Sequence, residues 1–263
     1  FEIINDIEDD VLDLSNLSFT LDKLIDREEE LGKLKGELKE TIEGDGNTIF
    51  IEGEKGIGKT RLVYEIKKMA TEKGFDIIKG GSLVGDYNPY RPFKDALDKF
   101  SKIKKEEKAF RSLISDFNLT TTDRKDKEMF DAQRKSIFYD TTKYVEKLSD
   151  FRPIVIFLDD LQWADKGTLN LLDYMADKLQ DKPVLFIGAY RPGDVTSEHA
   201  LNETLNRMSR KKLYDKIELK QLDENGIEEL VKNITDTDEV PEEFVKNMKD
   251  KTKGNPLFIE ESI

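Results

Sequence analysis

The chain has 263 residues, no cysteine, 38% charged residues and a formal net charge of −13. That length suffices for a sizeable core, and the lack of a signal peptide or long apolar run excludes a membrane span and favours a soluble, cytoplasmic protein. Because the chain opens on Phe1 and stops at Ile263 inside a predicted helix, we expect it to belong to a longer polypeptide whose other domains are its partners.

The negative charge is concentrated at the start of the chain. Residues 1–30 contain eleven acidic and two basic side chains, a net charge of −9, which leaves −4 for the remainder. We interpret residues 1–22 as an acidic linker, because such runs are usually solvated. Positive and negative charges nearly balance in the rest of the chain, and its first residues are acidic. The chain therefore lacks the basic surface of a dedicated nucleic-acid binder, and nucleic acid is not an expected partner.

A strand is predicted over 48–51, and a glycine-rich string follows it at once. The string fits the pattern G-x-x-x-x-G-K-[ST] and comprises Gly53, Glu54, Lys55, Gly56, Ile57, Gly58, Lys59 and Thr60. Its glycines let the backbone turn so that successive N–H groups and the next helix's N-terminus face phosphate oxygens. Lys59 then reaches the β- and γ-phosphates, and the Thr60 hydroxyl ligates Mg²⁺. We therefore predict a nucleoside triphosphate site that includes this string and the following Arg61.

Helices are predicted between the strands. Residues 61–72 and 168–179 carry apolar side chains at helical spacing, and residues 130–148 form a further helical segment. A strand over 74–79 follows the first helix, whereas the polar stretch 100–127 is predicted as surface helix and loop. Strands that alternate with helices imply an α/β fold with a doubly wound parallel sheet.

A buried strand over 153–158 ends in two acidic residues, Asp159 and Asp160. Parallel strands deliver such side chains to the carboxyl edge of the sheet, where the glycine-rich string also lies. We predict that Asp159 joins the Mg²⁺ shell and that Asp160 orients an attacking water or accepts its proton. On its own the pair is a weak signal, because strands often end in Asp for reasons of turn chemistry.

Another apolar strand, over 184–190, delivers Arg191 to the same edge. We predict that Arg191 contacts the γ-phosphate, with Lys59 and Asp160 as the other catalytic residues. The alternative is a structural ion pair with Asp159, Asp160 or Asp194. A shorter, alternating segment over 216–219 is predicted as an edge strand, and the single histidine, His199, as an exposed residue without a role.

The C-terminal part is predicted to be helical. Segments 224–233 and 241–251 have helical character, and Gly254-Asn255-Pro256 follows them. We interpret 23–221 as the nucleotide-binding domain and 222–263 as the start of a helical lid over the nucleotide.

Five segments together resemble a known family. The most specific is 158–165, Leu-Asp-Asp-Leu-Gln-Trp-Ala-Asp; the others are 25–31, 188–191, 217–223 and 254–256. In this order they resemble the STAND class of signal-transduction ATPases, most closely the Orc1-like AAA modules found in LuxR-type regulators, in multidomain kinases and beside cyclases. The resemblance runs from about residue 24 to residue 263. It implies a P-loop NTPase of the AAA/STAND type, with adenine rather than guanine as the base.

The resemblance also implies roles for single residues. Ile25, Asp26 and Arg27 correspond to the segment that packs on the adenine, and Asp26 stands where the family usually has glycine. Pro256 corresponds to the position from which the lid touches the nucleotide, although the same residues would also simply stop a helix. Trp163 and Asp165 fit the family signature, Trp163 either as a packing anchor or as a contact residue.

For the whole module, the resemblance implies a slow Mg²⁺-dependent ATPase that acts as a switch. ADP holds a closed monomer, and ATP favours an open form that can self-associate. Arg207 and Arg210 precede the final strand, where related ATPases can offer an arginine to a neighbouring subunit.

Three functions stay open at this stage. The first is a regulatory ATPase switch in a larger signalling or transcription-regulating protein. The second is an initiator-like AAA ATPase acting on DNA, which the negative charge disfavours for this part of the chain. The third is a non-catalytic scaffold locked by ADP.

Overall fold

The computed structural model describes residues 24–85, 88–103 and 127–263. The predicted acidic linker over 1–22 and most of the predicted polar stretch 100–127 lie outside the described residues. Contacts between Cα atoms divide the chain into two compact units. The larger unit is Glu28–Lys220, and the smaller one joins Gln221–Ile263 to the described residues 24–27.

A parallel sheet of five strands forms the centre of the larger unit, within the described residues. Its order is β2-β3-β4-β1-β5. The strands are β1 (Asn47–Glu52), β2 (Asp76–Gly81), β3 (Ile154–Asp159), β4 (Val184–Tyr190) and β5 (Asp215–Glu218). β3, β4 and β1 are nearly continuous apolar runs because both of their faces are covered. Among the described strands, β5 pairs only with β1, and its sequence alternates. The predicted doubly wound parallel sheet and its edge strand are confirmed.

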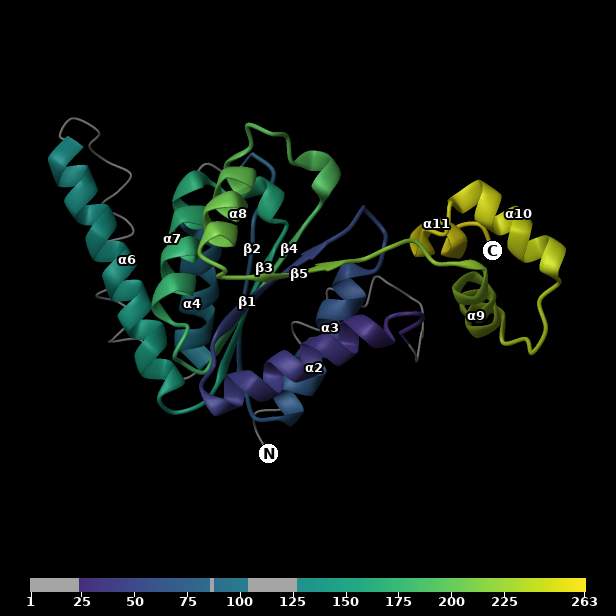
Figure 1. The fold of residues 1–263 in the computed structure, drawn as a ribbon, viewed down its shortest axis with the longest axis horizontal. Helices are drawn as coiled ribbons and strands as arrows, with labels where there is room; N and C mark the ends of the chain where they lie inside the picture. Colours follow the sequence, from purple (N-terminus) through teal and green to yellow (C-terminus); the bar gives the residue numbers. More distant parts are fainter. Residues whose placement is uncertain (1–23, 86–87, 104–126) are drawn as a thin grey trace. The chain divides into compact units, whose positions relative to one another are not determined.

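Helices cover both faces of this sheet, as Figure 1 shows. α2 and α3 lie on one face; α4, α7 and α8 lie on the other, with α6 packed outside α7. The bounds are α2 (Glu28–Glu43), α3 (Lys59–Glu72), α4 (Arg91–Ile103), α6 (Lys127–Ser149), α7 (Lys166–Lys178) and α8 (Ala200–Arg210). Two 3₁₀ turns, η1 (Leu161–Trp163) and η2 (Pro192–Asp194), follow β3 and β4.

One glycine of the sheet allows a close approach that matters for the site. Gly188 on β4 pairs in register with Phe50 on β1. A Cβ at Gly188 would lie 2.5 Å from the Leu161 side chain and 2.8 Å from the Phe50 ring. Leu161 is fully buried in the core. The lack of a side chain at this position therefore lets η1 pack directly onto β4.

The smaller unit has its own apolar core. It contains α9 (Glu224–Thr235), α10 (Glu242–Thr252) and α11 (Pro256–Glu260). Its core residues are Ile25, Leu222, Ile227, Leu230, Val231, Val245, Met248 and Ile259. The sequence analysis assigned residues 23–27 to the nucleotide-binding domain, but the described residues 24–27 group with this unit instead.

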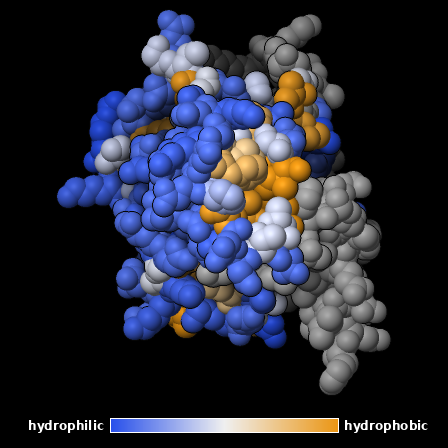
Figure 2. Space-filling model, turned by 90° about the vertical axis from the view of Figure 1, so that its right-hand side faces the viewer, coloured by the Kyte–Doolittle hydropathy of each residue, from blue (hydrophilic) through white to orange (hydrophobic). Residues whose placement is uncertain are grey.

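Figure 2 shows an apolar patch on an otherwise hydrophilic face of the molecule. In the smaller unit the exposed large apolar residues are Phe244, Phe258 and Ile263. Within the part of the chain that the structure describes, no helix has both the length and the apolar character needed to cross a membrane.

Candidate nucleotide-binding site

The glycine-rich string forms the loop between β1 and α3, at the carboxyl edge of the sheet. Gly56 and Gly58 have φ values of 80° and 105°, and Gly58 precedes the first residue of α3. L-residues with a side chain rarely adopt such values, which explains the glycines at both positions. The loop thus has the strand before it and the helix after it that the phosphate-binding pattern requires.

Lys59 is the first residue of α3, and its side chain reaches back to the start of this loop. Its Nζ donates hydrogen bonds to the carbonyl oxygens of Gly53, at 2.6 Å, and Glu54, at 2.9 Å. Burial and the nearby positive charge of Arg191 lower the pKa of the Lys59 ammonium group, while Asp159, Asp160 and Glu54 oppose this shift. The loop carbonyls therefore hold the ammonium group among the acidic and basic groups of the sheet edge.

Asp159 ends β3, and Asp160 begins the turn into η1. Burial, together with the adjacent charge of Asp160, raises the pKa of the Asp159 carboxyl group. The backbone of Asp160 is left-handed, with φ 51° and ψ 45°, a conformation that Asp tolerates better than most residues. Asp159 accepts a hydrogen bond from the Asp160 backbone N–H at 2.9 Å.

Arg191 follows β4 and pairs with Asp160. Its Nη2 lies 3.2 Å from Asp160 Oδ1, and its Nη1 lies 4.0 Å from Asp194 Oδ2. The structural pairing that the sequence analysis gave as an alternative is therefore present. A contact of Arg191 with a γ-phosphate stays a prediction.

Gln162 was not identified from the sequence as a site residue. It is buried, with 1% exposure. Its Nε2 donates to Asp160 Oδ1 at 2.7 Å, and its Oε1 accepts from the Arg191 backbone N–H at 3.1 Å. The Gln162 side chain thus contacts both the Asp160 carboxylate and the backbone of Arg191, the residue predicted to contact the γ-phosphate.

A second polar group beneath the loop was also missed. Glu52 and Tyr190 are the last residues of β1 and β4 and are paired in register. The Tyr190 hydroxyl donates a hydrogen bond to Glu52, and Lys216 Nζ lies 2.7 Å from the other carboxylate oxygen. Burial and this contact with Glu52 raise the pKa of the Tyr190 hydroxyl group. The group joins β1, β4 and β5, and its members Glu52 and Tyr190 directly precede Gly53 and Arg191.

The two other signature residues lie near the same edge. Asp165 caps α7 and accepts hydrogen bonds from Thr168 and from the Tyr90 backbone N–H, the latter at 3.2 Å. It therefore ties the start of α4 to α7. Trp163 is 37% exposed and lines a shallow hollow with Ser82 and Leu83.

The remaining predicted nucleotide contacts fall into two groups. Thr60 is exposed in the first turn of α3, and Arg61 forms an ion pair with Glu65 at 2.9 Å. Ile25, Arg27 and Pro256 belong to the smaller unit, so their contacts with a nucleotide stay predictions. Within that unit Pro256 is the first residue of α11, which Asn255 caps by accepting a hydrogen bond from Leu257 N at 3.1 Å.

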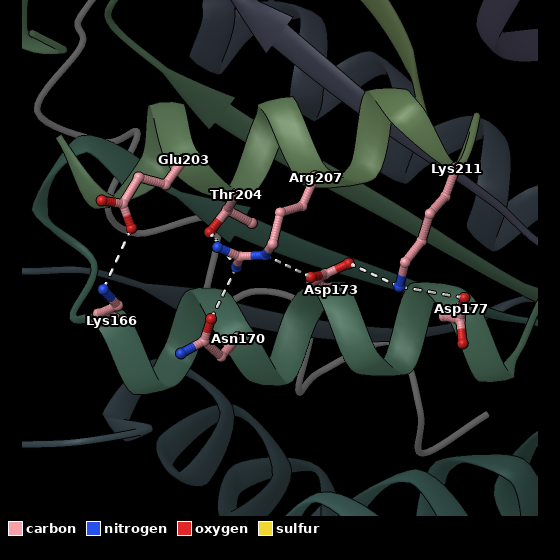
Figure 3. A network of polar contacts seen from close by, with 8 residues as sticks. All are labelled: Lys166, Asn170, Asp173, Asp177, Glu203, Thr204, Arg207 and Lys211. Carbon is pink, nitrogen blue, oxygen red and sulfur yellow. Dashed lines mark hydrogen bonds and ion pairs between the residues drawn. The ribbon is translucent and has the colours of Figure 1, made fainter. Parts of the chain in front are cut away.

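Arg207 contacts α7 of its own chain, as Figure 3 shows. Its guanidinium group donates to Asp173 at 3.0 Å, to Asn170 at 2.8 Å and to Thr204 at 3.0 Å. The neighbouring Arg210 is exposed. The expectation for His199 was wrong, because its side chain is half-buried and caps α8 by accepting a hydrogen bond from Leu201 N at 3.1 Å.

Solved structures with the same fold include nucleotide-bound proteins. The replication initiator DnaA bound to AMPPCP and single-stranded DNA aligns with a TM-score of 0.50 and 16% identity, over 93% of this chain and 63% of that one. AMPPCP-bound DnaA from Aquifex aeolicus gives a TM-score of 0.49 and 16% identity, over 93% and 62% of the two chains. This chain therefore spans less than two thirds of the length of these proteins. At this identity the likeness concerns the fold alone.

A third solved structure is a STAND protein with a tetratricopeptide repeat sensor from Pyrococcus horikoshii. It aligns with a TM-score of 0.41 and 17% identity, over 86% of this chain and 28% of that one. A comparison with curated proteins gives no match.

The profile of the AAA ATPase domain family matches residues 23–187, which include the glycine-rich loop, both acidic residues and most of β4. This match confirms the resemblance to AAA-type modules that the sequence motifs indicated. The chain belongs to the AAA ATPase domain family.

Proposed function

We propose that this chain is an ATP-binding and slowly hydrolysing switch module of a larger signalling or transcription-regulating protein. The observation that carries the proposal is the convergence of Lys59, Asp159, Asp160 and Arg191 around one glycine-rich loop. Their charges act on one another, and Asp160 and Arg191 are in direct contact. A phosphate loop, two acidic residues and an arginine are the groups that phosphoryl transfer needs for positioning and charge stabilisation.

Each residue has a role in this proposal. The loop N–H groups and Lys59 bind the phosphates, and Arg191 detects the γ-phosphate by exchanging its contact with Asp160 for one with a phosphate oxygen. Asp160 then orients the attacking water or accepts its proton. Ile25 and Arg27 are proposed to contact the adenine side, and Pro256 to transmit the state of the γ-phosphate to the smaller unit.

The donor set fits Mg²⁺. This ion usually keeps several waters and takes one or two protein oxygens besides the substrate phosphates. Thr60 and Asp159 would hold it, and it would supply charge neutralisation on the phosphates. The Asp159 carboxyl group is poorly solvated and lies next to that of Asp160. A divalent cation would offset the repulsion between these two negative charges. Among the described residues, no three or more acidic, histidine or cysteine side chains are grouped so that they could hold a metal ion, so a metal site independent of nucleotide is not part of the proposal.

The test is to identify the nucleotide released when the purified chain is denatured and to measure phosphate release from Mg-ATP. We expect bound ADP and slow turnover. Asp160→Asn should lower turnover about 100-fold or more. Asp181→Asn, at an exposed position before β4, is the matched control for the loss of one carboxylate charge. A folded chain that neither contains nor binds nucleotide would refute the proposal.

Stably bound ADP without turnover in the wild type would favour the non-catalytic scaffold instead. That outcome has a structural basis, because Arg191 and Gln162 both engage Asp160 Oδ1. An initiator-like role on DNA has weaker support, since the net charge of −13 opposes phosphate binding. Salt-sensitive binding of a single-stranded oligonucleotide to this chain would favour it.

Self-association upon binding of ATP and a cytoplasmic location are part of the switch proposal. Sedimentation of the chain with ADP and with AMPPCP tests the first. A mass that is the same in both states would restrict the switch to changes within one chain.

A further inference from the structure

The side chain of Gln162 is held at both of its ends. Its Nε2 donates to Asp160 Oδ1 at 2.7 Å, and its Oε1 accepts from the Arg191 backbone N–H at 3.1 Å. A carboxamide has a donor end and an acceptor end, so only one of its two flipped orientations satisfies a carboxylate and an N–H group together. With 1% exposure, water cannot replace either partner without cost.

The turn that carries Gln162 is itself fixed. Asp160 has a left-handed backbone, and its carbonyl oxygen accepts from Trp163 N at 2.9 Å, which closes η1. Leu161 anchors that turn over Gly188 of β4. This geometry turns the Gln162 side chain back toward the Asp160 carboxylate and across to the first residue after β4.

We infer that Gln162 is a positioning residue that fixes the Asp160 carboxylate and links it to the strand end that carries Arg191. The inference rests on the proposed function and adds to it a residue that the family match and the fold comparisons do not assign. Asp160 Oδ1 receives Gln162 Nε2 and Arg191 Nη2 together. When Arg191 leaves Asp160 for a phosphate, Gln162 keeps the carboxylate in place for the attacking water.

The same contact couples the two strand ends. A movement of the Arg191 backbone is transmitted through Gln162 to the carboxylate, because the amide is bonded to both groups. Supporting groups of this kind lower activity by about 10- to 100-fold when removed, without taking part in substrate binding.

The test compares two carboxamides with the same bonding pattern. Gln162→Met keeps the side-chain volume and removes both hydrogen bonds. Asn47→Leu is the matched control. Asn47 donates to Glu37 at 2.8 Å and accepts from Thr48 N at 2.7 Å, but it lies at the other end of β1.

We expect Gln162→Met to lower kcat about 10- to 100-fold with KM for Mg-ATP and Kd for Mg-ADP within about threefold of wild type. Asn47→Leu should leave kcat and KM within about threefold of wild type. If Gln162→Met does not fold, Gln162→Asn serves the same test, because its shorter side chain cannot reach both partners.

A second readout does not depend on turnover. Amide hydrogen exchange at Arg191, resolved by ¹⁵N-arginine labelling without nucleotide, should become at least about tenfold faster in Gln162→Met. It should stay at the wild-type rate in Asn47→Leu.

Wild-type kcat in Gln162→Met, or unchanged exchange at Arg191, would overturn the role of Gln162 and leave the proposed function standing. A KM that rises in parallel with the fall in kcat/KM would also overturn it, since Gln162 would then act on binding. A wild-type chain without turnover would overturn the proposed function and this role together.

Discussion

The contact of Arg207 with α7 leads to a prediction about stability that also decides between two roles for this residue. In Arg207→Met the side chain keeps its aliphatic part and loses its hydrogen bonds to Asp173, Asn170 and Thr204. The Asp173 side chain is 13% exposed, and among the described residues it would keep only Lys211, at 3.8 Å, as an ion-pair partner. Arg207 itself is 35% exposed, so solvent weakens the pair, and we estimate a loss of about 2 kcal/mol.

Thermal unfolding measures this loss. For a unit of this size, about 2 kcal/mol corresponds to a fall in Tm of roughly 4 to 8 °C. Arg210→Met is the matched control, because Arg210 is exposed on the same helix, and its change should stay within about 0.5 kcal/mol. An unchanged Tm in Arg207→Met, together with a fall in turnover that depends on chain concentration, would refute the structural role and indicate an arginine that acts on a neighbouring subunit.

Three further predictions follow from contacts described above. Lys59→Met should weaken Mg-ADP binding at least about 100-fold, because it removes the ammonium group that we propose binds the phosphates, and calorimetry with circular dichroism as a folding control would measure it. Gly188→Ala should lower the free energy of unfolding by about 1 to 3 kcal/mol in urea titrations, since the new methyl group meets Leu161 and Phe50; an unchanged midpoint would contradict this. Burial raises the folded-state pKa of the Glu37 carboxyl group, so stability should fall as pH rises from about 4.5 through that raised pKa. Glu37→Gln should flatten this slope, and an equal slope in both proteins would contradict the assignment.

The loop, the acidic pair and Arg191 could be predicted from the sequence because their signals are local. A strand, a glycine-rich string and a helix follow one another without interruption from Asn47 to Glu72, and each strand end points to the same edge of a parallel sheet. The helix α4 was missed although its signal is also local. Phe93, Ala96, Leu97 and Phe100 have helical spacing and are all buried.

The contacts that support the site could not be predicted, because each needs information that is not local. The pairing of Glu52 with Tyr190 requires that β1 and β4 be neighbours, and strand order is not encoded in either segment alone. The contacts of Arg207 depend on which side of α8 packs against α7. The bond between Gln162 and Asp160 depends on the left-handed backbone of Asp160, whereas the sequence analysis treated that residue only as the end of a strand.

The position of Arg191 beside the glycine-rich loop follows from the order of the strands, which its sequence alone does not reveal. From the sequence, Arg191 was only one residue at the edge of the sheet, predicted to contact the γ-phosphate, with a structural ion pair as the alternative. Once β1 and β4 are adjacent with Glu52 opposite Tyr190, the next residues along the two strands are Gly53 and Arg191, and the Gly53 N–H donates to the Tyr190 carbonyl oxygen at 3.3 Å. The register alone therefore brings the start of the phosphate loop beside Arg191. The ion pair with Asp160 and a contact with phosphate are then not exclusive roles, because an arginine paired with Asp160 at this position is already within the group of charges that surrounds Lys59.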